Sequence, residues 1–533
     1  MGFTPNWEEV QPQNKWRILL KQSRFALWAL YSSVGSMMLG FDYGTAGTAT
    51  AYPAFQEQFG IPWPSAPSGY LVPARWQSGW SAATSAGGLV GALLAGWLVE
   101  KIGRKHLFGG GAVVTAVGIA MQVGSHEWKL FLGGRIVNGE ANEVNIALIQ
   151  ANDLQVAAFS SYFSLRQFGL VRIQNYEPEN CKIGLELTKH VAILLVIYPF
   201  FPESPYYLIK IGKDDAARKA LIHVHGGHDQ SLIDAEMKRL AAQVEFSEEL
   251  QRAAMAKGPP LLQVFQGTNL KRTMIAVLPV AGQQFIGAAF VLGYITYFLS
   301  LLKVNDYFTV SVVLYIIMLL SNLSAFVFAE SVGRRTLLVP GIFCLTVTLL
   351  VMGIMGCLTS SAAIWVILVC IFLWAIAYQL TVGACGFALA SEISTLPLRP
   401  AAQTVVLLAQ LIVGWVIGFI SPYMINPDAG NLGAKVGFVF FGMGVPLCVL
   451  FYFYIPETKG LSFEEMDYLF NNHTSCRHFQ SAIKARRAAA GNVLEVEVGG
   501  EIVKGETSIV KGETTATAEQ VSTNSDEWKG ATV

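Results

Sequence analysis

The chain has 533 residues, of which 53% are hydrophobic and only 14% are charged, and its mean hydropathy is +0.44. The 37 basic and 37 acidic side chains cancel, so the net charge gives no sign of a nucleic-acid-binding protein. The apolar residues come in runs of about 20, the length that crosses roughly 30 Å of hydrocarbon. The sequence therefore predicts an all-α membrane protein with many spans.

Five regions follow from the alternation of apolar and polar stretches along the chain. They are a cytosolic N-terminus (1–24), an N-terminal transmembrane bundle (25–201), a cytosolic linker with helices (202–272), a C-terminal transmembrane bundle (273–455) and a cytosolic, largely disordered tail (456–533). The spans that the sequence predicts clearly are 25–46, 79–99 and 107–123 in the first bundle, and 274–299, 308–328, 336–357, 363–388, 401–425 and 435–454 in the second.

Basic residues set the expected orientation. They precede the first span, follow the second, and are frequent in the linker and at the start of the tail. Loops rich in Lys and Arg stay on the cytosolic side. Both termini are therefore expected in the cytosol, which requires an even number of spans.

One basic turn occurs twice, as "LVEKIGRKHLF" (98–108) and as "FAESVGRRTLL" (328–338). Each copy lies between the second and third spans of a bundle. Each bundle also closes on a Pro-Glu motif, "PESP" at Pro202 and "PETK" at Pro456. Two similar six-span bundles joined by a cytosolic segment are the parallel-repeat plan of many secondary transporters.

Nine stretches together resemble the sugar porter family of the major facilitator superfamily, of the fungal hexose and α-glucoside permease type. They are "GFDYGTAGTATAYPAFQEQFG", "VEKIGRK", "GGRIVNG", "PESPYYLIKIGK", "GQQFIGAAFVLGYITYF", "AESVGRR", "SEISTLPLRP", "SPYMINPDAGNLGAKVGFVFFG" and "PETKGLSFEEMDYLF". The resemblance implies the major facilitator fold, with two pseudo-symmetric six-helix bundles and nominally 12 spans.

Residues 129–201 depart from this plan. Gly103 and Pro202 are 99 residues apart, whereas Gly333 and Pro456 are 123 apart, so the first half is short by about one span. The fourth span continues from "GGRIVNG" into the polar run "EANEVNIALIQAND". Either these polar side chains line a cavity, or the sequence has a lesion from a deletion or a wrongly joined exon. The lesion is the favoured interpretation.

Asp42 is the only acid in the first predicted span. A carboxyl group there must be neutral, paired or in water. The resemblance implies proton coupling at this position; the alternative is a helix-end carboxylate at the extracellular rim.

Two side-chain amides, Gln283 and Gln284, lie in the middle of the seventh predicted span. An amide both donates and accepts, as a sugar hydroxyl does, although hydrogen bonding between helices is the alternative. The resemblance implies a substrate site formed by Gln283, Gln284, Tyr294, Phe387 and Gln410. Because this set has fewer polar groups than a typical hexose site, glucose itself is in doubt.

A cytosolic gate is expected where ionic side chains gather at helix ends. Glu392 and Arg399, seven residues apart, would share a face if one helix ran through both. The predicted gate residues are Glu100, Gly103, Arg104, Lys105, Glu203, Glu330, Gly333, Arg334, Arg335, Glu392, Arg399 and Glu457. Tyr206 stands where the family has an Arg, which weakens the N-terminal part of this gate.

The leading hypothesis is a secondary transporter of a hexose, an α-glucoside or a polyol, working by alternating access with proton symport in a fungal plasma membrane. The alternatives are a transporter of another hydroxylated metabolite (quinate-like or secondary), a non-transporting sugar sensor, and an inactive paralogue. The expected partners are the substrate, a proton and the lipid bilayer, for a monomer that binds no nucleic acid. No enzyme activity, cofactor or metal is expected, and the seven cysteines contain no C-x-x-C pair.

Overall fold

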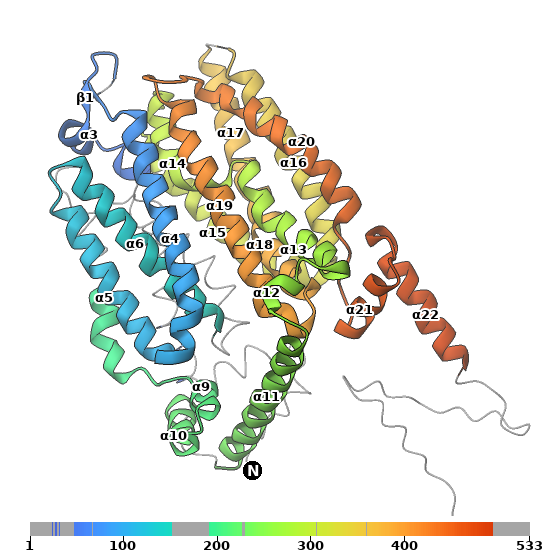
Figure 1. Cartoon of the computed structure of the whole chain (residues 1–533). Helices are drawn as coiled ribbons and strands as arrows, with labels where there is room; N and C mark the ends of the chain where they lie inside the picture. Colours follow the sequence, from blue (N-terminus) through green and yellow to red (C-terminus); the bar gives the residue numbers. More distant parts are fainter. Residues whose placement is uncertain are drawn as a thin grey trace, which may run out of the picture. The chain divides into compact units, whose positions relative to one another are not determined.

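The computed structural model of the chain describes residues 24, 27–28, 31, 47–66, 68–151, 191–225, 230–304, 306–358 and 360–493 (Figure 1). Across this part of the chain the backbone is almost entirely helical, and its strands are the short antiparallel pair β1 (Ile61–Pro62) and β2 (Tyr70–Leu71). The predicted all-α class is confirmed. Residues 1–480 form one compact unit, and residues 481–533 form a second.

The helices of the N-terminal half are α3 (Pro53–Phe59), α4 (Ala74–Ile102), α5 (Arg104–Val123), α6 (Trp128–Ala151) and the apolar helix Val191–Phe200, which ends in η3 (Tyr198–Phe200). Those of the linker are α9 (Pro205–Lys210), α10 (Asp214–His225), α11 (Gln230–Ala256) and α12 (Pro260–Gln263).

The helices of the C-terminal half are α13 (Gly267–Phe285), α14 (Ala288–Leu301), α15 (Tyr307–Val332), α16 (Arg334–Met355), α17 (Ser361–Tyr378), η4 (Gln379–Gly383), α18 (Ala384–Ile393), η5 (Leu396–Leu398), α19 (Arg399–Ile425), η6 (Gly433–Lys435) and α20 (Val436–Tyr454). After them come α21 (Phe463–Asn471), η7 (Cys476–His478) and α22 (Phe479–Val493).

Seven helical stretches of the described chain are long and apolar enough to cross a membrane. They are Arg104–Val123, Gly267–Leu301, Tyr307–Ala325, Arg334–Met355, Ser361–Ile393, Leu396–Ile425 and Gly433–Tyr454. They coincide with the predicted third span and with all six predicted spans of the second half. The chain is therefore a multi-pass membrane protein. The predicted second span lies inside α4.

The N-terminal half depends on a close approach of α4 to α6. A Cβ added to Gly139 of α6 would collide with the Thr84 carbonyl of α4, and one added to Gly87 of α4 would collide with the Ile136 carbonyl of α6. Helices in a membrane gain from such backbone contact, because small residues let van der Waals surfaces meet where no hydrophobic effect is available.

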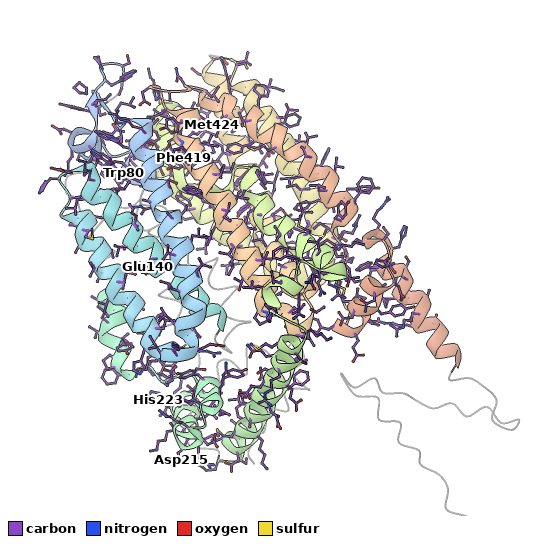
Figure 2. The ribbon with its side chains drawn as sticks, viewed as in Figure 1. Trp80, Glu140, Asp215, His223, Phe419 and Met424 are labelled. Atoms are coloured by element: carbon purple, nitrogen blue, oxygen red, sulfur yellow. The ribbon has the colours of Figure 1, made fainter. Side chains whose placement is uncertain are left out.

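The polar stretch after Gly139 is helical as far as Ala151, the end of α6. Glu140, labelled in Figure 2, lies half-buried on this helix. The side chains of residues 142–151 and all of residues 152–190 lie outside the described part. The choice between a cavity lining and a lesion therefore stays a prediction.

Two helices of the C-terminal half are interrupted in the middle. The helix that starts at Gly267 breaks between Phe285 and Ala288, and the Nε1–H of Trp374 donates to the Ile286 carbonyl freed by the break, at 3.2 Å. The helix that starts at Ser361 contains the π-helical segment η4. Irregular backbone is tolerated at membrane depth where protein buries it, and π segments are frequent at functional sites.

The sequence region expected to be a largely disordered tail contains ordered helix, which corrects that prediction for residues 463–493. Helix α21 starts with a capping box, in which Ser462 and Glu465 satisfy each other's backbone N–H groups. Met466, Leu469 and Phe470 are buried on one face. The low overall hydrophobicity of the tail concealed this short amphipathic segment.

Replacing Gly139 by Ala should destabilise the protein by about 1–3 kcal/mol, because the added methyl overpacks the α4–α6 contact. The measurement is the thermal midpoint of detergent-solubilised protein. Gly110→Ala is the matched control, since a Cβ on Gly110 of α5 has open space around it. Equal midpoints for the two variants would contradict the close helix contact.

Candidate functional site

The first copy of the repeated turn is a single-residue link between α4 and α5. Gly103 has φ 90°, and the backbone N–H groups of Arg104 and Lys105 both donate to Glu203 Oε1, at 3.0 and 2.9 Å. The first N–H groups of a helix lack intrahelical partners and carry a partial positive charge. Glu203 therefore caps α5 from the far end of the same half.

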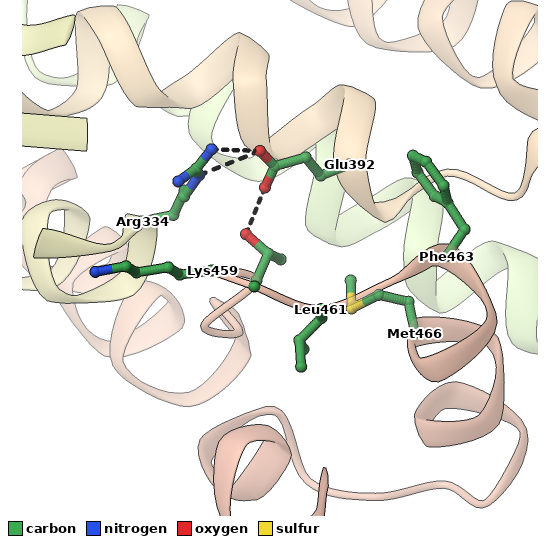
Figure 3. Close-up of a pocket in the computed structure, with 8 residues that line it drawn as sticks. Arg334, Glu392, Lys459, Leu461, Phe463 and Met466 are labelled. Atoms are coloured by element: carbon green, nitrogen blue, oxygen red, sulfur yellow. Dashed lines mark hydrogen bonds and ion pairs between the residues drawn. The ribbon is translucent and has the colours of Figure 1, made fainter. Parts of the chain in front are cut away.

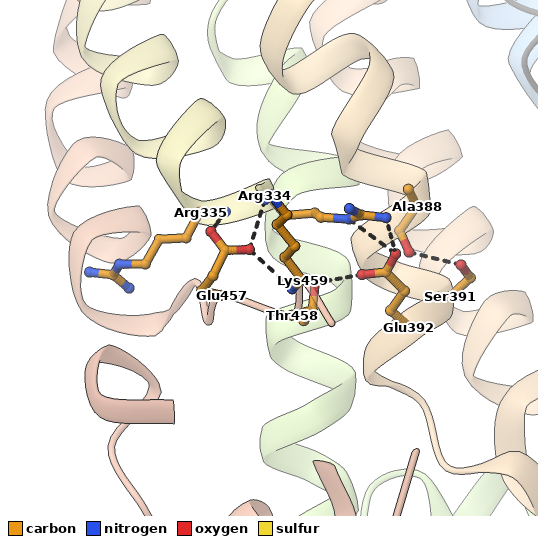
Figure 4. Close-up of polar contacts among 8 residues, drawn as sticks. All are labelled: Arg334, Arg335, Ala388, Ser391, Glu392, Glu457, Thr458 and Lys459. Atoms are coloured by element: carbon orange, nitrogen blue, oxygen red, sulfur yellow. Dashed lines mark hydrogen bonds and ion pairs between the residues drawn. The ribbon is translucent and has the colours of Figure 1, made fainter. Parts of the chain in front are cut away.

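The second copy repeats this arrangement between α15 and α16 (Figure 4). Gly333 has φ 111°, and the backbone N–H groups of Arg334 and Arg335 donate to Oε1 and Oε2 of Glu457, at 2.9 and 3.1 Å. A Cβ on Gly333 would lie 2.6 Å from Glu457 Oε2. The Gly-Arg turns and the Pro-Glu motifs, which are separate in the sequence, are thus two parts of one contact. We call the side of the molecule where the turns at Gly103 and Gly333 lie the motif end. The opposite side is called the loop end.

The second base of each turn reaches the end of the last helix of its half. Lys105 Nζ donates to the Pro199 carbonyl at 3.1 Å and lies 5.4 Å from the Tyr198 ring. Arg335 donates to the Tyr452 carbonyl at 2.6 Å and to the Ile455 carbonyl, with its guanidinium 5.9 Å from the Tyr452 ring.

The sequence interpretation missed the two tyrosines. Each stands five residues before its glutamate, in "YPFFPES" and "YFYIPET". This shared spacing was the sequence signal from which the two tyrosines could have been predicted as partners of the basic turns.

Glu392 pairs with Arg334 (Figures 3 and 4). Glu392 Oε1 accepts from Arg334 Nε and Nη2 at 3.1 and 2.8 Å, and Glu392 Oε2 accepts from Thr458 Oγ1 at 2.5 Å. Both charged side chains are half-buried, 20% and 29% exposed, so the pair is less screened than a surface ion pair.

The condition under which Glu392 and Arg399 would share one helical face, a single helix through both, is not met. Helix α18 ends at Ile393 and α19 begins at Arg399, with the extended residues Ser394 and Thr395 between them. The Arg399 guanidinium instead lies 4.5 Å from the Phe463 ring. The side chain of Glu330 lies outside the described part.

The N-terminal counterpart of the ion pair uses hydroxyl and aromatic groups in the described part of the chain. Arg104 Nη1 donates to Ser204 Oγ at 2.9 Å, and its guanidinium lies 5.2 Å from the Tyr206 ring. The Tyr206 hydroxyl is 2.7 Å from Ser247 Oγ of α11. Glu100 pairs with Lys210 at 3.2 Å on an exposed surface.

Gln283 and Gln284 differ in what they have available. The Gln283 amide is already engaged, since its Nε2 donates to the Val280 carbonyl at 2.8 Å and its Oε1 accepts from the Tyr378 hydroxyl at 2.6 Å. Gln284 is 9% exposed, and its Oε1 has no hydrogen-bond partner in the described chain. A Cβ on Gly414 of α19 would lie 3.7 Å from Gln284 Cδ, so this amide faces α19.

The other predicted substrate residues are spread over the same half. Gln410 is half-buried on α19, one turn before Gly414, and lies on the side of the bundle that Gln284 faces. Phe387 packs against the buried cluster that includes Val280. The Tyr294 hydroxyl points to the Gln77 carbonyl of α4, at 3.5 Å. The structure thus groups Gln284 with Gln410 and directs Tyr294 to the N-terminal half, while Asp42 lies outside the described residues.

Arg135, which was not predicted as a site residue, lies on α6 and is only 2% exposed. Asn138, one turn later, is fully buried. A guanidinium inside a membrane bundle has to be compensated by an anion or by polar groups. The motif "GGRIVNG", already noted for its resemblance, was the signal that pointed to it.

Comparison with known proteins places these features in context. The sequence profile of the family described as "Sugar (and other) transporter" matches residues 28–141 and 167–470. The chain is 31% identical to the MFS transporter fmqE of Aspergillus fumigatus, over 91% of this chain and 93% of that one. It is 24% identical to the general alpha-glucoside permease of Saccharomyces cerevisiae, over 87% and 78%.

Among solved structures, the proton:xylose symporter XylE of E. coli superposes with a TM-score of 0.64 at 17% sequence identity, covering 84% of this chain and 99% of that one. This likeness confirms the predicted major facilitator fold. The profile match skips residues 142–166, inside the region whose sequence departs from the family plan.

Replacing Gly333 by Ala should destabilise the protein by about 2–5 kcal/mol. The φ of 111° is strained for any other residue, and the added Cβ displaces the capping carboxylate of Glu457. Differential scanning fluorimetry in detergent measures the shift. The control Gly258→Ala shares a similarly large positive φ of 122° but meets no neighbour, so it reports the cost of the positive φ without the collision with a carboxylate. A control shift as large as that of Gly333→Ala would show that the carboxylate contact contributes nothing.

Proposed function

Because the chain belongs to the sugar (and other) transporter family of the major facilitator superfamily, we propose that it carries a hexose, an α-glucoside or a polyol across the membrane by alternating access. The observation that supports this best is the open acceptor of Gln284, buried on α13 beside the helix break and facing α19. Binding sites of such transporters lie near the midplane, at interrupted helices.

The amide of Gln284 is the proposed direct contact with a substrate hydroxyl. Its Oε1 accepts and its Nε2 donates, and a bound hydroxyl satisfies an acceptor that is otherwise buried without a partner. We assign Gln283 a positioning role, because Tyr378 and Val280 already hold its amide. Gln410 of α19 completes the polar side, and Phe387 offers an apolar ring face.

The identity of the substrate has a second candidate. The relative at 31% identity is named only as an MFS transporter, whereas the one at 24% is an alpha-glucoside permease. The predicted set of site residues, in which Phe387 is apolar and Gln283 and Tyr294 have other partners, also suits a less polar ligand than a hexose. Another hydroxylated metabolite, quinate-like or secondary, is therefore the alternative substrate class. A non-transporting sugar sensor and an inactive paralogue are the outcomes if no substrate moves.

Proton symport is proposed through Asp42. A carboxyl group within a predicted membrane span must be neutral, paired or in water, so reversible protonation is the chemistry available to Asp42.

The motif end is proposed as the cytosolic gate, since its bases favour the cytosolic side. Both termini would then be cytosolic, in a plasma-membrane protein that acts as a monomer. No enzyme activity, cofactor or nucleic-acid partner is proposed. The half-buried pair of Arg334 and Glu392 is the ionic contact whose solvation would change as this gate opens.

Replacing Gln284 by Ala should raise the KM of uptake about tenfold, the effect of losing one hydrogen-bonding group in the binding site. The assay is uptake of radiolabelled glucose, maltose and polyols in a yeast strain lacking hexose transporters. Gln251→Ala, on the exposed surface of α11, should leave KM unchanged. If the wild-type chain reaches the cell surface and transports none of these compounds, the sensor and inactive alternatives lead.

Replacing Asp42 by Asn should abolish accumulation against a gradient while leaving exchange of labelled for unlabelled substrate, because the carboxamide no longer carries a proton. Extracellular alkalinisation on substrate addition reports the coupled proton. Asp306→Asn, in the loop before α15, is the control and should keep both activities. Accumulation retained in the Asp42 variant would remove it from the coupling mechanism.

A further inference from the structure

A corner at the loop end joins the two halves through one fully buried side chain, that of Asn426. Asn426 follows α19 and is 0% exposed. Its Nδ2 donates to the Val72 carbonyl at 2.9 Å and to Asp428 Oδ1 at 2.7 Å. Its Oδ1 accepts from the Tyr297 hydroxyl and from Gln77 Nε2, the latter at 3.3 Å. All donor and acceptor positions of this amide are therefore in use.

Asp428 makes a second link from the same corner. Its Oδ2 accepts from the backbone N–H of Ala74, the first residue of α4, at 3.0 Å. The residue before that helix is Pro73, which has no side chain able to cap it. The positive end of α4 is thus capped by a carboxylate from the other half, an interaction favoured by the helix dipole. Asp428 itself is exposed, so this link is the weaker one.

Other neutral contacts join the same two halves through different segments. The Tyr307 hydroxyl donates to the Ala51 carbonyl at 3.2 Å, and the Tyr52 ring stacks on Phe308 with centroids 4.6 Å apart. Burial, together with the neighbouring Tyr307, raises the pKa of Tyr52 to about 12. Tyr52 therefore stays uncharged at physiological pH.

The helices behind the corner are close as well. Figure 2 labels Trp80 on α4 and Phe419 and Met424 on α19, where the two helices run side by side. A Cβ on Gly418 of α19 would lie 4.0 Å from Ser81 Cβ of α4. The loop ends of the two halves are in direct contact here.

We infer that the Asn426–Asp428 corner is a latch that holds the loop ends of the two halves together and must release in every cycle. The inference rests on the proposed transport function, in which the loop end is the outer side of the pathway. Its chemistry suits reversible release. Water replaces these hydrogen bonds when the ends separate, so each bond adds only a small net free energy, and no charge is left unpaired in a dry interior.

Two cysteine substitutions test the contact directly. Ser81→Cys together with Gly418→Cys places the two Cβ atoms about 4.0 Å apart, within the range of a disulfide. Oxidation should give a cross-link detectable by mass spectrometry of the full chain. Failure to cross-link at any substrate concentration would overturn the inference, whatever the protein transports.

Release is measured with Ser81→Cys alone, labelled on intact cells by a membrane-impermeant maleimide. The labelling rate follows the fraction of molecules whose loop end is open. Asn426→Ala should raise this rate about tenfold, because it removes several hydrogen bonds at once, and Asp428→Ala should raise it by a smaller factor. Gln251→Ala, on the exposed surface of α11, should leave it unchanged.

The native Cys385 of α18, which is free and fully buried, serves as the control for folding. Labelling at this position would rise only if the C-terminal half came apart. If Asn426→Ala or Asp428→Ala unfolds by this criterion, Gln77→Ala replaces it as the test variant. This substitution removes the hydrogen bond to Asn426 Oδ1 from the N-terminal side of the corner. Unchanged Ser81→Cys labelling in the folded latch variants overturns the latch. A raised rate supports it even if no substrate is found, so failure of the proposed function stays distinguishable.

Discussion

The contact on which both halves depend is a glutamate placed on the first backbone N–H groups of a helix. Glu203 and Glu457 each come after the last helix of a half and cap its third helix, α5 or α16. Each contact closes its half, because it joins parts of the chain 99 and 123 residues apart. The preceding glycine has no side chain, which leaves the carboxylate room to approach the helix end. The repeated basic turn is thus explained by a repeated structural need: two bundles, each closed by one carboxylate and one helix dipole.

The two ends of the molecule use different chemistry. The motif end combines a carboxylate, a guanidinium and a hydroxyl, in the group of Glu392, Arg334 and Thr458. The loop end relies on amide and phenol groups around Asn426, with one carboxylate at its rim. Between them, α13 and α17 are interrupted, so the central side chains sit where the backbone itself departs from regular helix. This arrangement places strong, charge-dependent contacts at one end and weaker, solvent-replaceable ones at the other.

Much of the fold could be predicted from the sequence, because a membrane span leaves a long apolar run and a basic turn leaves its charges. All six spans of the second half and both Gly-Arg turns follow from these signals. The partner of Glu392 could not be predicted in this way. The seven-residue spacing to Arg399 assumes a continuous helix, but that helix stops at Ile393. The corner at Asn426 was not foreseen either. In the sequence, a single Asn after a span looks like any loop residue. Its role depends on hydrogen bonds of the corner with Val72, Gln77 and Ala74 of the other half, which only the structure shows. Among the site glutamines, only the structure separates the engaged Gln283 from the open Gln284.

The unequal chemistry of the two ends has a consequence for ionic strength. Dissolved ions reach a partly exposed charge pair such as Arg334 and Glu392, although they screen it less than a surface pair, and the Debye length shrinks from about 10 Å at 0.1 M to about 3 Å at 1 M. The neutral hydrogen bonds of Asn426 are buried and carry no net charge for ions to screen. Rising salt therefore weakens the motif end while leaving most of the loop end intact, so the ionic medium acts on the two ends of this protein unequally.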